Sequence, residues 1–490
     1  MENIVTDIRP LLAVLVSAVA VLFILMARKL PNLREGVSYV AAGIKFLLIL
    51  SMVPVVLAGG VVEFTVFEVL PGIELKFRAD ALGMFFALTA SFLWIIATTY
   101  SIGYMRSLNE HAQTRYFSCF AIALSAAIGV AFAGNLFTLY LFYELLSIMT
   151  YPLVAHHEDD PAWEGGTKYI VYLVGTSKTF LLAAVVMTYM ITGTLEFKEG
   201  GIFTTAMPVV PVILTYIFFL IGFAKAGIMP LHNWLPSAMV APTPVSGLLH
   251  AVAVVKVGVF SVVRIMLYVF GVEVMGAFGL GMATAFFVSF TIITASIIAL
   301  TKDDLKARLA YSTVSQLSYI IIGVAMLTPS GITGGILHIA CHAFSKITLF
   351  FCAGSIYVAS GIKKISKLDG IARRMPITMA AFTIGAFSMI GVPVAAGFAS
   401  KWYLAIGTLE AGSLALLMVL LVSTVLNAAY FLPIIFRAYF KEAPNTEEFL
   451  RIKETPFVWV PLSITAVISV IIGVYPDFLL SMIEIIVGNL

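Results

Sequence analysis

Apolar runs long enough to cross a lipid bilayer recur along this chain from its beginning to its end. Each such run is expected to form a helix of about 20 residues, because lipid offers the backbone no hydrogen-bond partner outside the helix. Charged residues make up only 11% of the 490 residues, whereas soluble domains contain about 25%. So few charges cannot cover a surface that faces water. The chain is therefore predicted to be an all-α, polytopic membrane protein in contact with the lipid bilayer.

The apolar runs number about fourteen, and they are not confined to the amino terminus as a cleaved signal peptide would be. They cover residues 11–27, 37–59, 81–105, 115–133, 135–155, 166–192, 208–229, 243–269, 275–300, 307–328, 332–359, 376–408, 411–437 and 456–476. The connection over 60–80 alternates between apolar and polar residues on both sides of Pro71-Gly72. This alternation predicts a β-hairpin lying on the membrane surface.

Lysine and arginine are unevenly divided between the two sets of alternating loops. One set carries eighteen basic residues: Arg28, Lys29, Arg34, Arg106, Arg115, Lys168, Lys302, Lys306, Arg308, Lys363, Lys364, Lys367, Arg373, Arg374, Arg437, Lys441, Arg451 and Lys453. The other set carries Arg9, Lys76, Arg78 and Lys198. Because cytoplasmic loops collect Lys and Arg, the imbalance predicts a multi-pass protein of the cell (plasma) membrane with both termini outside.

The remaining basic residues lie inside the predicted spans: Lys45, Lys178, Lys225, Lys256, Arg264, Lys346 and Lys401. A charge within the membrane costs about 2.5–3.5 kcal/mol on insertion scales, so it faces the protein interior and usually has a function. Lys45 and Arg264 lie near span ends, where snorkelling toward the headgroups is the expected reason for their presence. The five deeper lysines are candidate functional residues, and structural pairing is the alternative explanation for each.

Glu144 is the only acidic residue in the middle of a predicted span. A buried carboxylate needs either a neighbouring cation or a bound proton. Burial disfavours the charged form of a lysine, whereas a nearby glutamate favours it. A lysine whose glutamate partner can approach or withdraw is therefore a protonation site under conformational control. This is the simplest proton-pumping element that such a sequence can build.

Histidines add further candidate sites for protons. His338, His342 and Lys346 follow one another at intervals of four residues and therefore share one face of a helix. A metal at the two histidines is not predicted, because no acidic third ligand is near and the His-Glu-x-x-His motif is absent. His250 precedes Lys256 by about one and two-thirds helical turns. A water molecule or a side-chain rotation would have to connect these two residues.

The composition argues against several other functions. The net charge of +3 is too small to indicate nucleic-acid binding. Cys119, Cys341 and Cys352 show no paired spacing, so neither disulfides nor a zinc or iron–sulfur site is predicted. There is no nucleotide-binding fingerprint either. We therefore expect no cofactor and no redox centre on this chain, and the sequence leaves open whether the chain is part of an enzyme.

Two predicted spans, the seventh and the twelfth, contain proline and glycine beside a lysine. One reads Phe-Ala-Lys-Ala-Gly-Ile-Met-Pro over 223–230, and the other reads Gly-Val-Pro-Val-Ala-Ala-Gly-Phe-Ala-Ser-Lys over 391–401. Proline removes a helix hydrogen bond and frees carbonyl groups at membrane depth, where they can solvate an ion. Broken helices in corresponding positions of two halves indicate the ion site of a transporter. Unrelated proline kinks are the alternative.

An offset of five spans reverses the topology, so the two breaks predict a five-helix unit repeated upside down. The first repeat, helices four to eight, covers 113–270, and the inverted second repeat, helices nine to thirteen, covers 271–438. Three helices and the surface hairpin over 1–112 precede these repeats, and a carboxy-terminal helix over 439–490 follows them.

The motif residues resemble a known family. Pro-Leu-His-Asn-Trp-Leu-Pro over 230–236, Ala-Pro-Thr-Pro-Val-Ser over 241–246, and His250 leading to Lys256 are similar to the signature of the antiporter-like subunits of respiratory complex I. Mrp-type sodium/proton antiporters and energy-converting membrane-bound hydrogenases share this signature. His-Ile-Ala-Cys-His-Ala-Phe-Ser-Lys over 338–346 resembles the stripe on the family's eleventh helix. Gly-Phe-Ala-Ser-Lys-Trp-Tyr over 397–403 is most similar to the Mrp D-type subunit.

The resemblance implies a role for each matching residue. Glu144 would pair with Lys225 and control its protonation. Lys256, with His250 nearby, would connect this pair to His338, His342 and Lys346, and Lys401 would be the acceptor on the exit side. Lys178 does not match a general family position and could compete for Glu144.

The resulting hypothesis is a proton-translocating subunit that works with other membrane subunits of a larger complex. The alternatives are a stand-alone sodium/proton antiporter and a structural subunit without transport. A structural subunit is disfavoured, because it would have been free to lose the buried lysines. Sodium prefers carboxylates and carbonyls, and one membrane acid against five deep lysines favours protons. Any sodium site is therefore expected on a neighbouring subunit.

Overall fold

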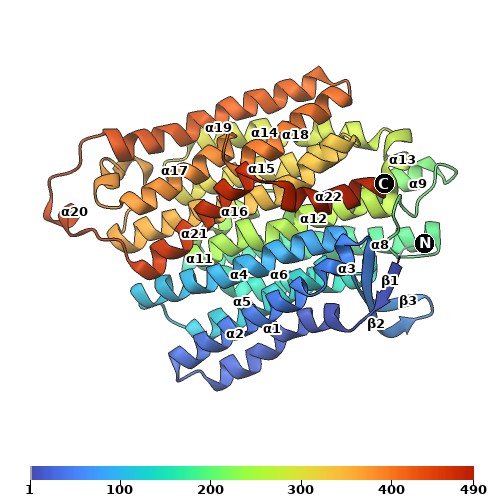
Figure 1. Ribbon diagram of the computed structural model, residues 1–490, viewed down its shortest axis with the longest axis horizontal. Coiled ribbons are helices and arrows are strands. Elements are labelled where there is room, and N and C mark those ends of the chain that lie inside the picture. Colours follow the sequence, from blue (N-terminus) through green and yellow to red (C-terminus); the bar gives the residue numbers. More distant parts are fainter. Residues whose placement is uncertain (1–2) are drawn as a thin grey trace.

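The chain folds into a bundle of long helices with a small sheet at one end (Figure 1). The computed structural model describes residues 3–490. Within this part of the chain, eleven helices are long and apolar enough to cross a membrane. The bundle begins with α1 (Arg9–Met26), α2 (Pro31–Leu50), α3 (Val53–Leu57), α4 (Ala81–Ser107), α5 (Gln113–Ala131), α6 (Leu136–Val154), α7 (Asp160–Thr176) and α8 (Leu182–Thr192). The π-helical turn Ser177–Leu181 joins α7 to α8, so these two helices form a single span.

Several helices in the middle of the chain are short or interrupted. It contains α9 (Val209–Gly222), α10 (Trp234–Ser237), α11 (Thr243–Gly247), α12 (Val254–Ile265), α13 (Gly271–Ala277), α14 (Leu280–Thr301), α15 (Leu305–Ala325) and α16 (Pro329–Ser360). The π-helical turns Leu248–Val252 and Met266–Phe270 join α11, α12 and α13 into one span. Short 3-10 turns lie at Ala224–Ala226 and Ala238–Val240.

The last part of the chain returns along the bundle. It contains α17 (Pro376–Ile390), α18 (Ala396–Glu410), α19 (Leu414–Phe440), α20 (Glu447–Arg451), α21 (Pro456–Val474) and α22 (Asp477–Gly488), with 3-10 turns at Ile365–Lys367 and Ile371–Arg373 before α17. Every predicted span coincides with a helix or with a pair of consecutive helices. The helix α22 was not predicted. It follows the fourteenth span and packs on α16 and α4.

Many of the helices begin at a polar side chain that replaces the missing hydrogen bonds of the first turn. The side chains of Asp80, Asn135, Asp159, Asp304 and Thr328 each accept a hydrogen bond from a backbone N–H of the helix that follows. These caps stop α4, α6, α7, α15 and α16 from fraying. Because each cap fixes the residue at which its helix begins, it also fixes how far along the bundle the side chains of that helix lie.

The predicted hairpin over 60–80 is confirmed. Strands β2 (Gly60–Leu70) and β3 (Ile73–Ala79) pair in antiparallel fashion around Pro71-Gly72, with Glu63 opposite Arg78. The sequence did not indicate that β1 (Asn3–Thr6) would add to β2 as a parallel third strand. The sheet lies at the same end of the bundle as both chain termini, and α20 lies at the opposite end (Figure 1).

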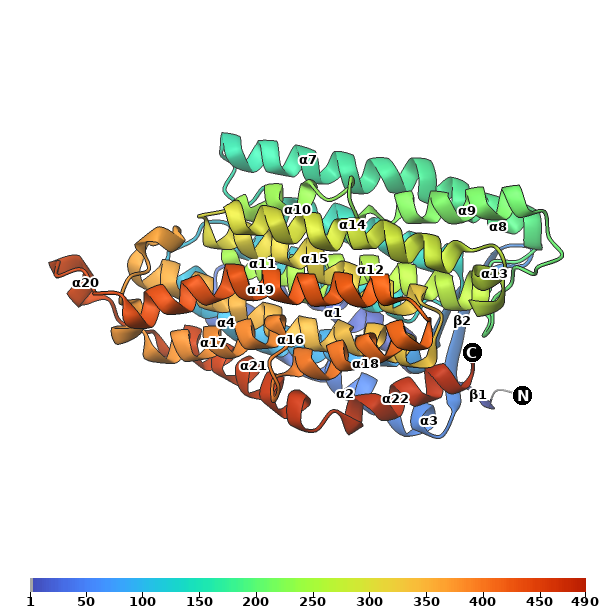
Figure 2. The same cartoon turned by 90° about the horizontal axis from the view of Figure 1, so that it is seen from above.

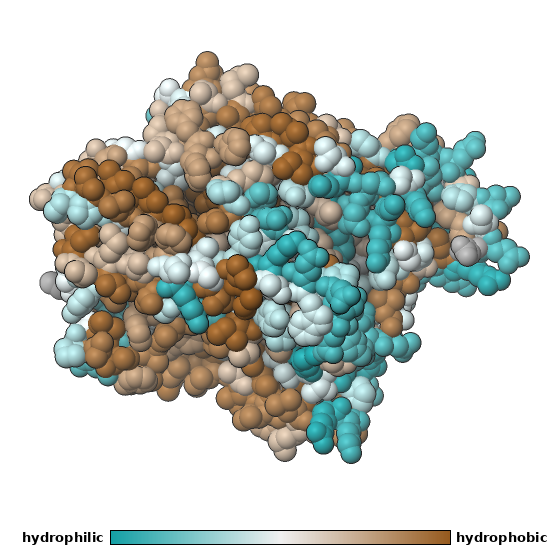
Figure 3. Space-filling view, turned by 180° about the vertical axis from the view of Figure 1, so that it is seen from behind, coloured by the Kyte–Doolittle hydropathy of each residue, from teal (hydrophilic) through white to brown (hydrophobic). Residues whose placement is uncertain are grey.

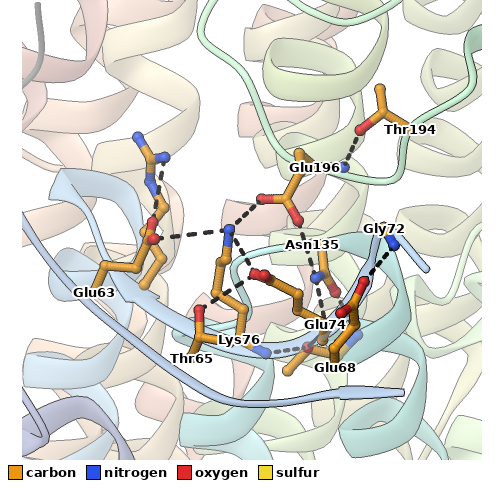
Figure 4. A network of polar contacts seen from close by, with 11 residues as sticks. Glu63, Thr65, Glu68, Gly72, Glu74, Lys76, Asn135, Thr194 and Glu196 are labelled. Atoms are coloured by element: carbon orange, nitrogen blue, oxygen red, sulfur yellow. Dashed lines mark hydrogen bonds and ion pairs between the residues drawn. The ribbon is translucent and has the colours of Figure 1, made fainter. Parts of the chain in front are cut away.

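Lys76 fastens the sheet to the helical bundle (Figure 4). Its ammonium lies 3.0 Å from a carboxylate oxygen of Glu196, 3.1 Å from Glu74 and 3.7 Å from Glu63. Asn135, which caps α6, donates to the carbonyl of Glu74 at 2.8 Å and to the carboxylate of Glu196 at 3.2 Å. The hairpin thereby holds the end of the helix that carries Glu144.

Two spans form the interior of the bundle. The most apolar stretches of Thr243–Ala277 and of α16 are wholly buried, whereas only a third of the corresponding stretches of α1 and α19 is buried. Seen from above, α7 forms one edge of the molecule, well away from α16 (Figure 2). Hydrophobic side chains cover much of the rear face, and hydrophilic ones gather toward the end that bears α20 (Figure 3). Polar residues on the two interior spans can therefore interact only with protein groups or with enclosed water.

The two predicted breaks are confirmed. The seventh span is interrupted after Gly222, and the twelfth is interrupted between Ile390 and Ala396. In the two predicted repeats, α5 packs on α6 and α14 packs on α15, which are corresponding helix pairs. The boundaries of the two repeats remain predictions.

Candidate functional site

Lys225 lies in the break of the seventh span. The helix α9 ends at Gly222, a 3-10 turn covers Ala224–Ala226, and Gly227 has a left-handed backbone with φ of 69°. The indole N–H of Trp234 donates to the carbonyl of Ala224 at 3.0 Å, so a carbonyl freed by the break is satisfied. The turn is wholly buried and aims the lysine into the protein.

The ammonium of Lys225 is held by α6. It donates to the carbonyl of Tyr143 at 2.8 Å and to the hydroxyl of Ser147 at 2.6 Å. It also lies 3.2 Å from the centre of the Tyr143 ring, a cation–π contact. Sequence reasoning missed both partners. Their positions on either side of Glu144 on the same helix were the only signal that could have indicated them.

Glu144 does not form the expected ion pair in this conformation. Both of its carboxylate oxygens are buried, and neither has a hydrogen-bond partner among the described residues. A buried, unpartnered carboxylate is costly unless it carries a proton or gains a cation. Because its neighbours Tyr143 and Ser147 hold the Lys225 ammonium, that ammonium is a cation that the carboxylate could gain.

Lys256 is in direct contact with the histidine stripe. Its ammonium lies 2.8 Å from Nδ1 of His342, and both residues are buried. The helix α12 packs closely on the Lys225 turn, because a Cβ added at Gly258 would lie 2.3 Å from the Lys225 carbonyl carbon. The structure thus brings the lysine of the eighth span against α16 on one side and against the broken seventh span on the other.

The stripe on α16 continues in both directions from His342. The ring of His338 is 6.0 Å from that of His342, and its nitrogens contact Ser400 at 2.8 Å and Gln316 at 3.0 Å. On the other side, Lys346 donates to the Ser312 hydroxyl at 2.8 Å. The residues of the stripe were predicted, but their polar partners on α15 and α18 were not.

Lys401 lies against the second helix break. Its ammonium donates to the carbonyls of Met389 at 2.7 Å and of Ile390 at 3.0 Å, which the interruption after α17 has freed. The ring of Tyr319 lies 5.0 Å away. A cation held by carbonyls at a broken helix is the arrangement that the sequence pattern indicated.

His250 lies apart from this chain of contacts. It occupies the π-helical turn Leu248–Val252, and its ring lies 4.8 Å from that of Phe350 between ring centres, tilted by 42°. Both ring nitrogens are buried, and neither has a partner among the described residues. The structure therefore does not connect His250 directly to Lys256.

Lys178 faces outward. It lies in the π-helical turn Ser177–Leu181 and is exposed on the surface of the bundle. Within residues 3–490 its ammonium forms no hydrogen bond and no ion pair. Lys178 therefore does not compete for Glu144 within this chain. A lysine exposed at membrane depth needs a partner from outside.

The snorkelling expected of Lys45 and Arg264 is wrong. Lys45 is wholly buried and donates to Ser17 at 2.5 Å, with its ammonium 5.2 Å from the Trp94 ring. Arg264 forms a buried two-pronged ion pair with Asp80, with 2.9 Å between Nη2 and Oδ1. Both side chains find protein partners because α2 and α12 turn these faces toward other helices, which periodicity alone does not reveal.

Gly391 is expected to be required for the position of Lys401. A Cβ at this glycine would lie 2.8 Å from Cδ of Lys401, and its φ is 94°. We expect Gly391→Ala to push the ammonium off the Met389 and Ile390 carbonyls and to slow ion translocation by about tenfold or more, since misplacements of about 1 Å have such effects. Translocation is measured with a pH-sensitive dye in proteoliposomes that contain the complete complex.

Gly412→Ala is the matched control for Gly391→Ala. Its φ of 65° imposes similar backbone strain, but a Cβ there would meet nothing within 4 Å. Both variants should lower thermal stability to a similar extent, and only Gly391→Ala should slow translocation. Equal translocation rates in the two variants would contradict this role of Gly391.

The fold and the buried lysines define a polytopic membrane protein. Its centre carries a row of protonatable groups, which consists of Lys225, Lys256, His342, His338, Lys346 and Lys401. Residues 133–427 match the family model described as NADH:quinone oxidoreductase/Mrp antiporter, TM. The chain belongs to this family.

Curated relatives agree with this assignment. The chain is 35% identical to NADH-quinone oxidoreductase subunit N of Desulforudis audaxviator, over 76% of this chain and 74% of the relative. It is 28% identical to NADH-quinone oxidoreductase subunit M of Rickettsia prowazekii, over 86% and 84%. It is 30% identical to a probable K(+)/H(+) antiporter protein of Rhizobium meliloti, over 75% of this chain but only 37% of that longer protein.

Two solved structures share the fold. A chain of the Mrp complex from Dietzia superposes with a TM-score of 0.86 at 21% identity, over 99% of this chain and 98% of the other. A chain of the membrane-bound sulfane sulfur reductase, an archaeal respiratory membrane complex, gives a TM-score of 0.83 at 24% identity, over 98% and 97%. The likeness therefore extends over the whole bundle.

Proposed function

We propose that this chain translocates protons as one subunit of a multisubunit membrane complex. The complex is either an Mrp-type cation/proton antiporter or an energy-converting, membrane-bound oxidoreductase related to complex I, of the hydrogenase or sulfur-reductase type. The observation that carries the proposal is the contact at 2.8 Å between Lys256 and His342 on the two wholly buried spans. A lysine that touches a histidine in the membrane interior has little structural value, but it can pass on a proton.

The proposed path begins at Glu144 and Lys225. The Lys225 ammonium donates to a carbonyl and a hydroxyl on α6, while the neighbouring carboxylate has no hydrogen-bond partner among the described residues. Movement of the ammonium from Ser147 to Glu144 would stabilise a carboxylate there, and the reverse movement would favour a protonated Glu144. This exchange would couple the protonation of Glu144 to the position of Lys225.

The path then crosses the middle of the membrane. From Lys256 a proton would pass to His342 and along the stripe to His338 and Lys346, with Ser312 and Gln316 as polar neighbours. Lys401, on its two carbonyls, would be the last acceptor. His250 would take part only through enclosed water or after a rotation, since its nitrogens have no direct partner among the described residues.

The charge of the site supports protons over sodium. Sodium is bound by carboxylates and carbonyls, whereas the groups along the proposed path are lysines and histidines with the single acid Glu144. The other buried acid described above, Asp80, is already paired with Arg264. Sodium exchange, where it occurs, would therefore use a neighbouring subunit, and no cofactor is required on this chain.

Neighbouring subunits are the expected partners. Lys178 is exposed on α7–α8 without a partner in the described chain, and a carboxylate from a neighbouring chain would satisfy it. The loop charges favour an orientation with both termini outside the plasma membrane. The sheet and both chain ends lie together at one end of the bundle, as two termini on the same side of the membrane require (Figure 1).

Replacing Lys256 tests the path. In proteoliposomes driven by the complex's own electron donor or by an imposed cation gradient, we expect Lys256→Met to reduce proton translocation by about 100-fold or more, the scale of losing a proton-transfer group. Lys45→Met is the matched control, because Lys45 is equally buried but lies outside the row. It should retain translocation within about twofold.

Two outcomes would contradict the proposal. Normal translocation by Lys256→Met would remove this residue from the path. Purification in mild detergent tests the context, since a monomer that exchanges sodium for protons would favour the stand-alone antiporter instead.

A further inference from the structure

A cluster of histidines and one glutamate lies outside the row of protonatable groups, where the connection between α4 and α5 meets the segment that follows α6. Glu110 and His111 belong to the connection between α4 and α5, and His156 and His157 follow the end of α6. One ligand atom each from Glu110, His111 and His156 lies within 4.8 Å of the other two. This group plays no part in the proposed proton path.

His156 is the unusual member of the cluster. Its side chain is wholly buried, yet neither ring nitrogen has a hydrogen-bond partner among the described residues. Buried polar atoms are nearly always paired, so an unpaired imidazole requires an explanation. Its Nε2 lies 3.9 Å from a carboxylate oxygen of Glu110, which is too long for a hydrogen bond but close enough for a shared ion.

The contacts of the cluster suit a cation ligand set. Neither ring nitrogen of His156 has a hydrogen-bond partner among the described residues, so both are open to an ion. Oε1 of Glu110 lies 3.4 Å from Nε2 of His157, whereas Oε2 of the same carboxylate faces His156. The competing cation Arg115 is engaged by Glu158.

We propose that Glu110, His111 and His156 bind a divalent transition-metal ion of the zinc class. Two imidazoles and one carboxylate form a donor set typical of zinc, with a fourth position left for water. His157 is a positioning residue, because it contacts Oε1 of Glu110 while Oε2 of that carboxylate faces His156. The rings of His111 and His156 are 4.8 Å apart at an angle of 32°, so one ion can reach both.

The three ligand atoms need to move only slightly closer together to surround a zinc ion. Ligand atoms around a tetrahedral zinc are separated by about 3.3–3.5 Å, since each bond is about 2.0–2.1 Å long. His111 is exposed and Glu110 lies in a connection between helices, so both side chains can rotate toward the fixed His156. A bound ion would tie the α4–α5 connection to the end of α6, the helix that holds Lys225.

Metal titration of the intact complex tests the site. After treatment with a chelator, the wild-type complex is titrated with Co²⁺, whose visible absorption band reports tetrahedral coordination, and with Zn²⁺ in competition. We expect saturable binding of one ion per chain. His156→Gln and Glu110→Gln should each weaken binding by at least about tenfold, and His157→Gln should weaken it by about tenfold.

Two further variants keep the test decisive. His111→Gln changes an exposed side chain and leaves the fold intact, so its loss of binding cannot be attributed to misfolding. His232→Gln removes a partly exposed histidine elsewhere and should leave binding unchanged. Absence of saturable binding, or equal affinity in wild type, His111→Gln and His156→Gln, would overturn the proposal. Proton translocation does not enter this measurement, so it stands independently of the proposed path.

Discussion

Replacing Lys225 by alanine is expected to abolish proton translocation, by about 100-fold or more, while the complex still assembles. The substitution removes the group that Tyr143 and Ser147 hold and that Glu144 faces, and it leaves no other protonatable side chain in the 3-10 turn of the described seventh span. Assembly should survive, because alanine fits the 3-10 turn and the Trp234 hydrogen bond to Ala224 does not involve the lysine side chain. The measurements are dye-reported proton movement in proteoliposomes and the subunit composition of the purified complex.

Two companion variants separate charge from proton transfer at Lys225. Lys225→Arg keeps a cation that cannot release its proton, so it should assemble well and still fail to translocate. Ser147→Ala removes one hydrogen bond, with a net contribution of about 1 kcal/mol, and should reduce the rate only several-fold. If Lys225→Arg pumps normally, the lysine supplies only charge and the proposed path is wrong.

Arg264→Ala is expected to have the largest effect on stability. It would leave the buried Asp80 carboxylate without the arginine that binds both of its oxygens, and breaking a buried ion pair costs about 3–5 kcal/mol. Asp80 also caps α4 by accepting a hydrogen bond from the N–H of Gly83 at 2.8 Å, so its displacement would loosen the start of that helix. We expect a lower thermal unfolding temperature in detergent and a smaller yield of assembled complex.

A double substitution tests the origin of this effect. In Asp80→Ala with Arg264→Met no charge is left unpaired, so a substantial part of the lost stability should return. If the double variant is less stable than Arg264→Ala by the full cost of a second independent loss, then the two side chains do not act as a pair. Lys225→Ala, which leaves this pair intact, should unfold near the wild-type temperature.

The fold was largely predictable, because the membrane imposes local rules. The breaks at Lys225 and near Lys401 were visible in the sequence, because each combines a proline, which removes a helix hydrogen bond, with a nearby glycine. The hairpin around Pro71-Gly72 followed from alternation in the same way. The added strand β1 and the helix α22 did not, because their formation depends on contacts with distant parts of the chain.

The sequence by itself determined which residues are charged at membrane depth, and the tertiary structure alone decided where each of them points. Lys45, Lys178 and Arg264 all occupy apolar spans, and their neighbours in the sequence do not distinguish them. The packing turns Lys45 toward Ser17, joins Arg264 to Asp80 and leaves Lys178 on the surface. The physical reason is that helices apolar on every side carry no periodic mark of their inward face, so that face is chosen by the neighbouring helices.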